Sequence, residues 1–233
     1  MNIVGIMQPY LFPYLGYWQT LCAVNKYVVY DDVNYIKGGW INRNNILLNG
    51  KAHLFTLSLN QASPFKKINE IEILTQESNL NKVLSCIRNA YLKAPYFKNV
   101  FPMIEEIIGY NDKNLGHYLF NQIKVLANYL EIETDIILSS ELTKNNTLKA
   151  QDKVIDICKR LSAGVYVNAI GGQALYDREV FGLNGIDLKF IKLLPIEYKQ
   201  FKNEFVPNLS IIDVMMFNDK KELQNLLRMY ELI

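Results

Sequence analysis

Met7-Gln-Pro-Tyr-Leu-Phe-Pro-Tyr-Leu-Gly-Tyr-Trp18 joins a strand-like apolar run at residues 2–6 to a helix-like run at residues 15–24. A second strand-like run, residues 27–30, follows and ends in Asp31 and Asp32. The order strand–helix–strand recurs near the other end of the chain, and it predicts a Rossmann-like α/β fold with a mostly parallel sheet and flanking helices. Ligands of open α/β sheets bind beyond the carboxyl ends of the strands. Polar side chains in these turns therefore indicate a binding site.

The middle of the chain adds a hairpin and helices to this pattern. Asn49-Gly50 between apolar runs is a strong hairpin signal. Alternation predicts another strand at residues 68–74, and helical spacing predicts helices at residues 96–109, at residues 112–130 and in a run capped by Ser78. We expect an α/β domain of residues 1–75 and 131–233. Residues 76–130 would form a helical subdomain packed on it, unless all of the chain folds as a single domain.

The last third returns to alternating elements. Strands are expected at residues 135–138, 165–168 and 188–191, and helices at residues 147–161, 175–181, 210–217 and 219–230. Gly164 is a favoured residue for the end of the first of these helices. Ser210 and Asp213 match a capping box, as do Asp219 and Glu222.

Composition excludes several classes of protein. Half of the 233 residues are hydrophobic and 21% are charged, as in ordinary globular domains. The net charge of +2 gives no field that favours nucleic acid. With no signal peptide and no membrane-length apolar run, we expect a cytoplasmic protein without a membrane partner. Cys22, Cys86 and Cys158 lack CxxC spacing, so we expect reduced thiols and no metal site. The sequence predicts neither a cofactor nor an oligomeric state.

The first candidate binding segment is the turn at residues 8–17, where Gln8, Tyr10, Tyr14 and Tyr17 are predicted substrate contacts. A glycine in the turn allows close approach, and free N–H groups at a helix start favour an anion such as phosphate. The alternative is a rigid turn whose aromatic rings plug the sheet edge. Tyr14-Leu-Gly-Tyr17 stands where nucleotidylyltransferases carry His-x-Gly-His, and the change to tyrosine argues against adenylyl transfer.

The second candidate segment begins with Asp31 and Asp32, either of which is a candidate to deprotonate an amine or orient a sugar hydroxyl. The alternative is a strand terminus with a salt bridge to Lys37 or Arg43. The Arg43 guanidinium suits phosphate or carboxylate. Substrate binding is predicted for the charged, aromatic and amide residues that follow: Lys37, Trp40, Asn42, Arg43 and Asn44.

The third candidate segment is Ile170-Gly-Gly172, placed after a strand and before a helix. Backbone amides of Gly171 and Gly172 could approach a phosphate there. A plain turn is the alternative.

Together these segments resemble the WbqC-like protein family. The resemblance rests on residues 7–17, 30–33, 35–37 and 40–44, with looser matches at residues 91–97, 171–172, 205–207 and 209–213, at Lys159, and at Tyr198 with Gln200. Gly39 stands where the family often has a polar or basic residue, and residues 216–218 lack the glycine that often follows. The resemblance implies a bacterial enzyme encoded with surface-polysaccharide genes, which transfers glycine or another acyl group to an amino sugar.

The leading hypothesis is thus a transferase that attaches an acyl or aminoacyl group to the amine of a nucleotide-linked amino sugar in surface-polysaccharide (O-antigen) biosynthesis. Asp31 or Asp32 would act on the amine, and Gln8, Tyr10 or Asn42 would donate to the oxyanion. The acyl donor, whether coenzyme A, a carrier protein, an aminoacyl-tRNA or a free amino acid, stays open. Two alternatives remain: a nucleotide-activating enzyme that forms an acyl-adenylate, and a non-catalytic module that binds a nucleotide sugar.

Overall fold

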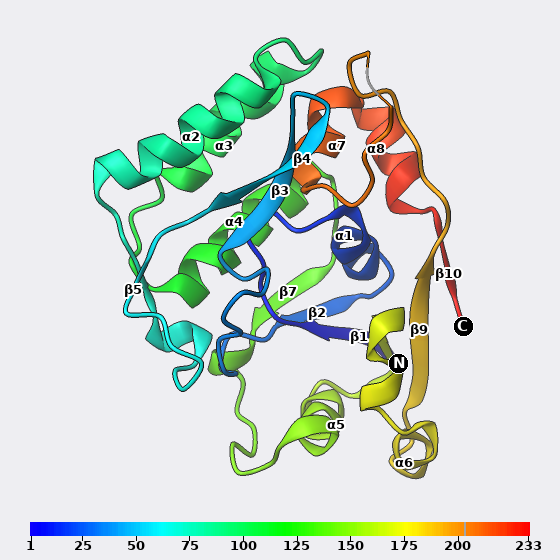
Figure 1. The fold of residues 1–233 in the computed structure, drawn as a ribbon. Helices are drawn as coiled ribbons and strands as arrows, with labels where there is room; N and C mark the ends of the chain where they lie inside the picture. Colours follow the sequence, from blue (N-terminus) through cyan, green and yellow to red (C-terminus); the bar gives the residue numbers. More distant parts are fainter. Residues whose placement is uncertain (203) are drawn as a thin grey trace.

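The computed structural model describes residues 1–202 and 204–233, and a six-stranded sheet lies at its centre (Figure 1). The strand order is β10-β9-β8-β1-β2-β7, with β10 antiparallel to β9 and the other neighbours parallel. The strands are β1 (Asn2–Met7), β2 (Lys26–Val29), β7 (Asp135–Leu138), β8 (Ala163–Ala169), β9 (Asp187–Leu193) and β10 (Tyr230–Leu232). The predicted α/β fold with a mostly parallel sheet is confirmed.

The order of the strands creates a switch point between β1 and β8. From β1 the chain builds outward through β2 to β7, and it then returns to the other side of β1 to build β8 and β9. In open α/β sheets, ligands bind at such a reversal, in the crevice beyond the carboxyl ends of the two strands. The turns after Met7 and after Ala169 lie at this place.

Helices cover both faces of the sheet because side chains along each strand point alternately to the two sides. Tyr27 and Val29 of β2 belong to the core beneath α1 and α8, whereas Val28 belongs to the core beneath α5 and α6. Figure 1 shows α5 and α6 on the side of the sheet opposite α1. The helices are α1 (Leu15–Cys22), α5 (Ala150–Arg160), α6 (Arg178–Leu183), α7 (Ile211–Phe217) and α8 (Lys220–Leu227).

The hairpin of β3 (Arg43–Leu48) and β4 (Lys51–Thr56) is confirmed, with Asn49 and Gly50 both at positive φ. It packs against α2 of the helical middle segment (Figure 1). That segment comprises α2 (Glu77–Tyr91), α3 (Phe97–Ile108) and α4 (Leu115–Tyr129). One hydrophobic core contains residues of the sheet, the hairpin and all three helices. The division into an α/β domain and a helical subdomain stays a prediction.

Several local predictions were wrong. The expected strand at residues 68–74 is mostly a 3-10 turn, η1 (Ile68–Glu70), followed by the two-residue β6 (Glu72–Ile73), which pairs with β5 (Leu59–Asn60). Helix α2 has Gln76 as its N-cap, so Ser78 lies inside the helix. The helix expected at residues 175–181 begins at Arg178, because Asp177 caps it, and η3 (Ile170–Leu175) precedes it.

Two chain reversals also differ from expectation. Helix α5 ends at Arg160, and Ser162 (φ +52°), not Gly164, takes the left-handed position after it. The final helix ends at Leu227, and residues 230–232 add the unpredicted edge strand β10.

Candidate functional site

The three predicted segments meet at the carboxyl edge of the sheet. Residues after β1, β2 and β8 are neighbours there because these strands are adjacent. The stretch at residues 40–44 packs on the first turn, since Leu11 N donates to the Trp40 carbonyl (3.3 Å) and Asn44 Nδ2 donates to the Leu11 carbonyl (2.9 Å).

The first turn is a strained structure held by polar side chains. Phe12 has φ +44°, a conformation that costs a non-glycine residue about 1–2 kcal/mol. Its carbonyl accepts from Asn44 Nδ2 (2.7 Å) and Ser210 Oγ (2.8 Å). Gln122 holds the other side: its Oε1 accepts from Phe12 N (3.0 Å) and its Nε2 donates to the Tyr10 carbonyl (2.9 Å). The conformation is therefore over-determined, as backbone strain at functional sites usually is.

The tyrosines of this turn divide into two groups. Tyr17 is fully buried, with its ring 5.5 Å from that of Tyr27 and 5.9 Å from the indole of Trp18. Tyr10, Tyr14 and Gln8 are half-buried at the sheet edge. Burial raises the pKa of Tyr10 and Tyr14, so both are neutral donors at neutral pH. Tyr17 thus lies in the core, whereas Tyr10 and Tyr14 border the edge where a ligand would bind.

Asp31 is a buried connector. Its Oδ1 accepts from the backbone N of Ser140 (2.9 Å) and its Oδ2 from Asn69 Nδ2 (3.2 Å). These bonds tie the end of β2 to η1 and to η2 (Ser139–Glu141). With its side chain fully enclosed and both oxygens occupied, Asp31 holds loops together, and a substrate amine cannot reach it without displacing them.

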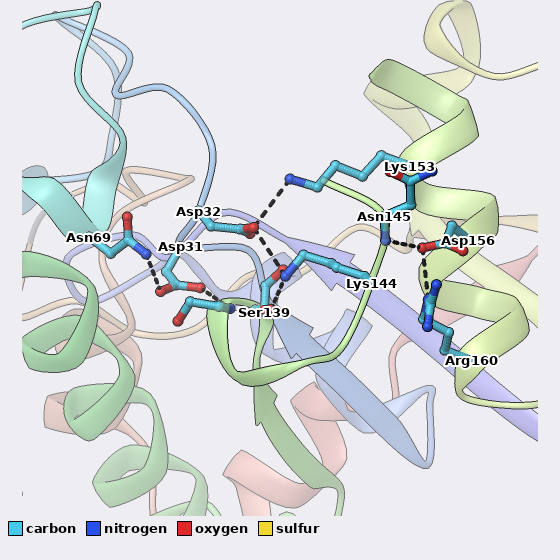
Figure 2. A network of polar contacts seen from close by, with 10 residues as sticks. Asp31, Asp32, Asn69, Ser139, Lys144, Asn145, Lys153, Asp156 and Arg160 are labelled. Atoms are coloured by element: carbon cyan, nitrogen blue, oxygen red, sulfur yellow. Dashed lines mark hydrogen bonds and ion pairs between the residues drawn. The ribbon is translucent and has the colours of Figure 1, made fainter. Parts of the chain in front are cut away.

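Asp32 forms the centre of a charged cluster with two lysines (Figure 2). Its Oδ2 lies 3.0 Å from Lys144 Nζ and 3.2 Å from Lys153 Nζ. The three side chains, here called the Asp32 cluster, are 7%, 1% and 10% exposed respectively. A salt bridge at this strand end, the alternative to a catalytic role, is thus present but not with Lys37 or Arg43: Lys37 is exposed, and Arg43 Nε donates to the Gly39 carbonyl (2.9 Å).

The Asp32 cluster gathers two ammonium groups on one carboxylate, in a place largely shielded from water and next in the chain to the buried carboxylate of Asp31. Burial is the largest effect on the pKa of Asp32 and raises it, but the Ser139 hydroxyl and both ammonium groups together outweigh burial. The net pKa is lowered, so Asp32 is a carboxylate at neutral pH. The two ammonium groups of the cluster are the groups that suit an anionic ligand.

Aromatic side chains border the Asp32 cluster. Lys153 Nζ lies 5.4 Å from the centre of the Tyr30 ring. Burial, then the nearby charges of Asp32 and Tyr176, raise the pKa of Tyr30. Tyr176 in turn contacts Tyr166 of β8, with its hydroxyl 3.4 Å away. The Asp32 cluster is thereby linked to the segment that follows β8.

The two glycines of that segment have different surroundings. A Cβ on Gly172 would lie 3.0 Å from Asn168 Nδ2, so close packing explains this glycine. A Cβ on Gly171 would meet no atom within 4 Å among the described residues, so its backbone borders open space. Gly171 is thus the better candidate for contact with a ligand.

The remaining predicted contacts divide between surface and interior. Trp40 is 47% exposed. Asn42 is buried and committed to the protein, since its Oδ1 accepts from Tyr35 Oη (2.8 Å) and its Nδ2 donates to the Leu57 carbonyl (2.8 Å). Asn42 and Asn44 therefore hold loops in place in this structure.

A second polar centre surrounds Asp213. Ser210 caps α7 as predicted, but Asp213 does not complete a capping box. Its Oδ1 accepts from Tyr91 Oη (2.8 Å), and its Oδ2 accepts from Tyr198 Oη (2.7 Å) and Gln200 Nε2 (2.6 Å). Burial raises the pKa of Asp213, and the three donors counteract it only in part. Asp213 fastens the loop after β9 to α7.

That loop forms one wall of a cavity of about 390 Å³ at the start of α1. Leu193 and Leu194 at the end of β9 line it, together with Tyr14 and Gly16 on the α1 side and Tyr198 on the loop. Of the predicted contacts, Tyr14 is the one that lines this cavity.

Lys144, Lys153 and Asp213 were not among the predicted site residues. Lys144 and Lys153 carry no local signal, because a lysine in a loop or on a helix usually belongs to a solvated face. Among residues 1–202 and 204–233, no group of three His, Cys, Asp or Glu side chains is arranged to bind a metal. None of the described helices has the length and apolarity needed to cross a membrane.

Comparison with known proteins identifies the family. The model of the WbqC-like protein family matches residues 8–225, so the chain belongs to this family. A relative from Mycobacterium tuberculosis (strain ATCC 25618 / H37Rv), named Uncharacterized protein Rv1507c, is 26% identical over 235 residues, covering 98% of each chain. No solved structure matches the chain. These comparisons confirm the predicted family, and they name no reaction.

Proposed function

We propose that this member of the WbqC-like family is a transferase that attaches an acyl or aminoacyl group to the amine of a nucleotide-linked amino sugar in surface-polysaccharide biosynthesis. The observation that carries the proposal is the Asp32 cluster, with its two ammonium groups beyond the carboxyl ends of β2 and β7. A nucleotide-linked sugar carries a diphosphate, and two ammonium groups suit that anion.

The diphosphate would lie against Lys153, which is the more exposed of the two lysines, and Lys144, at 1% exposed, would contribute its charge without direct contact. The backbone at Gly171 would lie on the other side of the phosphates. Asp32 would keep the two lysines in place and orient the sugar. Its lowered pKa makes it a weak base, so orientation of the amine is the better role for it. Asp31 would position the loops that carry these groups.

The reaction needs an activated acyl donor, a thioester or ester. The lone pair of the neutral amine attacks the acyl carbonyl carbon, the new C–N bond forms, and the C–S or C–O bond to the leaving group breaks. The proton lost by the amine ends on the leaving thiolate or alkoxide. Gln8 and Tyr10, half-buried beyond β1, are candidates to donate to the oxyanion of the tetrahedral intermediate.

A binding experiment tests the nucleotide half of the proposal. UDP, dTDP and GDP are each added to the protein, and the shift in Tm is measured, because a ligand that binds the native state stabilises it. At least one should raise Tm. Lys153→Met should weaken binding by about tenfold or more, since it removes one ion contact to phosphate. Lys149→Met, at an exposed lysine just before α5, is the matched control and should bind normally.

An activity experiment tests the transfer itself. Nucleotide-linked amino sugars are incubated with acetyl-coenzyme A, glycyl-tRNA, or glycine with ATP, and mass spectrometry detects the amide. Amide formation without ATP supports direct transfer. ATP consumption with pyrophosphate release would instead support the acyl-adenylate alternative, which rests on the strand–turn–helix layout at β1 and α1 and has tyrosines where nucleotidylyltransferases have histidines. Nucleotide-sugar binding with no product from any donor would support the binding module.

A further inference from the structure

The cavity at the start of α1 is distinct from the Asp32 cluster. It lies on the β9 side of the switch point, whereas the Asp32 cluster lies on the β2 and β7 side. Its walls are mainly apolar, with Leu193, Ile196, Phe205 and Leu209 among them. A volume of about 390 Å³ is within the range of small-molecule sites.

One residue that lines this cavity has a buried polar atom without a partner. Gln19 lines the cavity and is fully buried. Its Nε2 donates to the carbonyls of Leu226 (2.7 Å) and Met229 (3.1 Å), and these bonds fix which way the amide faces. Its Oε1 is buried with no hydrogen-bond partner among the described residues. A buried acceptor left unpaired is costly, so a ligand with an N–H or O–H group would satisfy it.

The start of the same helix, one turn before Gln19, supplies a donor. Helix α1 begins at the cavity, and its N-cap residue Tyr14 makes no side-chain capping bond. Leu15 and Gly16 of its first turn also line the cavity. Tyr17 N already donates to the Tyr14 carbonyl (3.0 Å), which leaves the N–H of Gly16 at this helix start to attract an acceptor such as a carbonyl oxygen. The cavity therefore offers an acceptor, a donor and an apolar surface.

We propose that this cavity binds the acyl group of the donor, and that the acyl group carries an N–H beside an apolar part. The N–H donates to Gln19 Oε1, and the carbonyl oxygen faces the start of α1. This assignment rests on the proposed transferase function. It places donor and acceptor on the two sides of the crevice between β8 and β1, so that the carbonyl and the sugar amine meet beyond the ends of these strands.

Benzamide and acetophenone provide a matched pair of probes. They have similar shapes, and only benzamide has an N–H group. We expect benzamide to bind at least about fivefold more tightly in an NMR titration, because acetophenone leaves Gln19 Oε1 unpaired. On the wild-type protein, nuclear Overhauser effects from the benzamide ring to the methyl groups of Ile196 and Leu209 should locate it in the cavity. Equal affinities, or contacts elsewhere, would overturn the assignment.

A variant that fills the cavity gives a second test. Ile196→Trp should abolish benzamide binding, whereas Ile36→Trp, at a residue that is 51% exposed and outside the cavity, should leave it intact. If no amide product is found but benzamide still binds beside Ile196, the transferase proposal fails and the cavity remains a binding site. If amide forms and Ile196→Trp leaves the KM for the acyl donor unchanged, the cavity assignment alone fails.

Discussion

Replacing Asp32 with alanine removes the one carboxylate shared by Lys144 and Lys153. Those side chains are only 1% and 10% exposed, so water cannot replace the lost partner without rearrangement. Breaking a buried ion pair on one side typically costs about 3–5 kcal/mol, because the other charge stays buried and unpaired. Since domains are stable by only about 5–15 kcal/mol, we expect Asp32→Ala to lose a large share of the free energy of unfolding.

Urea denaturation followed by circular dichroism measures this loss. Lys153→Met should cost less, because Asp32 keeps Lys144, and the double variant should show a coupling energy of about 1 kcal/mol or more. The triple variant Asp32→Leu, Lys144→Met and Lys153→Met should recover most of the stability, since apolar residues can replace a buried ionic group.

The pH dependence of the free energy of unfolding gives a further check on the role of Asp32. Because the folded pKa of Asp32 is lowered, its contribution is present above the ordinary carboxyl pKa, about 4, and is lost as pH falls through the folded value. The stability gap between the wild type and Asp32→Ala should therefore shrink in acid. A loss below about 1 kcal/mol at neutral pH, with no coupling to Lys153, would refute the reasoning.

Three further predictions concern the turn, the helix start and the loop beyond β9. Gly16→Ala should destabilise the protein by about 1–3 kcal/mol, because a Cβ there would lie 2.6 Å from two side-chain atoms. Gly182→Ala is the control: a Cβ there would meet no described atom within 4 Å, and it should stabilise α6 by up to about 1 kcal/mol. Asn44→Ala should cost about 2–3 kcal/mol in urea denaturation, since two carbonyls of the strained turn lose a donor, and Asn45→Ala should be nearly neutral. Because the folded pKa of Asp213 is raised, the contribution of this residue to the free energy of unfolding falls as pH rises above about 4. The stability of Asp213→Asn relative to the wild type should therefore improve over that range.

Each prediction has an outcome that contradicts it. Equal effects of alanine at Gly16 and Gly182 would mean that the close packing at the start of α1 is not rigid. A neutral Asn44→Ala would show that the turn holds its conformation without that amide. A stability difference that stays constant with pH would show that Asp213 titrates alike in the folded and unfolded chain.

The sheet and hairpin were predictable because their signals are local. Apolar runs next to polar turns identify β1, β2 and β8, and Asn49-Gly50 identifies the hairpin within a few residues of sequence. The strand β10 was missed because its pairing with β9 is a tertiary contact, and its three residues carry no pattern of their own. Ser162 takes the left-handed position instead of Gly164 because β8 already begins at Ala163, which places Gly164 in the strand.

The candidate site was predictable in place and only partly in its residues. The carboxyl edge follows from strand order, so Gln8, Asp32 and Gly171 were expected there. Lys144 and Lys153, the partners of Asp32, follow β7 in the chain, and no residue pattern near residues 31–44 predicts them. Asn42 and Asn44 were interpreted as ligand groups, but their amides pair with backbone carbonyls and with Tyr35, because a strained turn and its neighbouring loop need fixed donors.

The two tryptophans adjoin the same turn from opposite environments. Trp18 is buried and its Nε1 donates to the Pro13 carbonyl (3.1 Å), whereas Trp40 is half-exposed and its backbone carbonyl accepts from Leu11 N (3.3 Å). Their indoles should therefore emit at different wavelengths, with Trp40 open to a soluble quencher and Trp18 protected. The intrinsic fluorescence of the chain thus provides a label-free reporter on both sides of the turn that borders the candidate site.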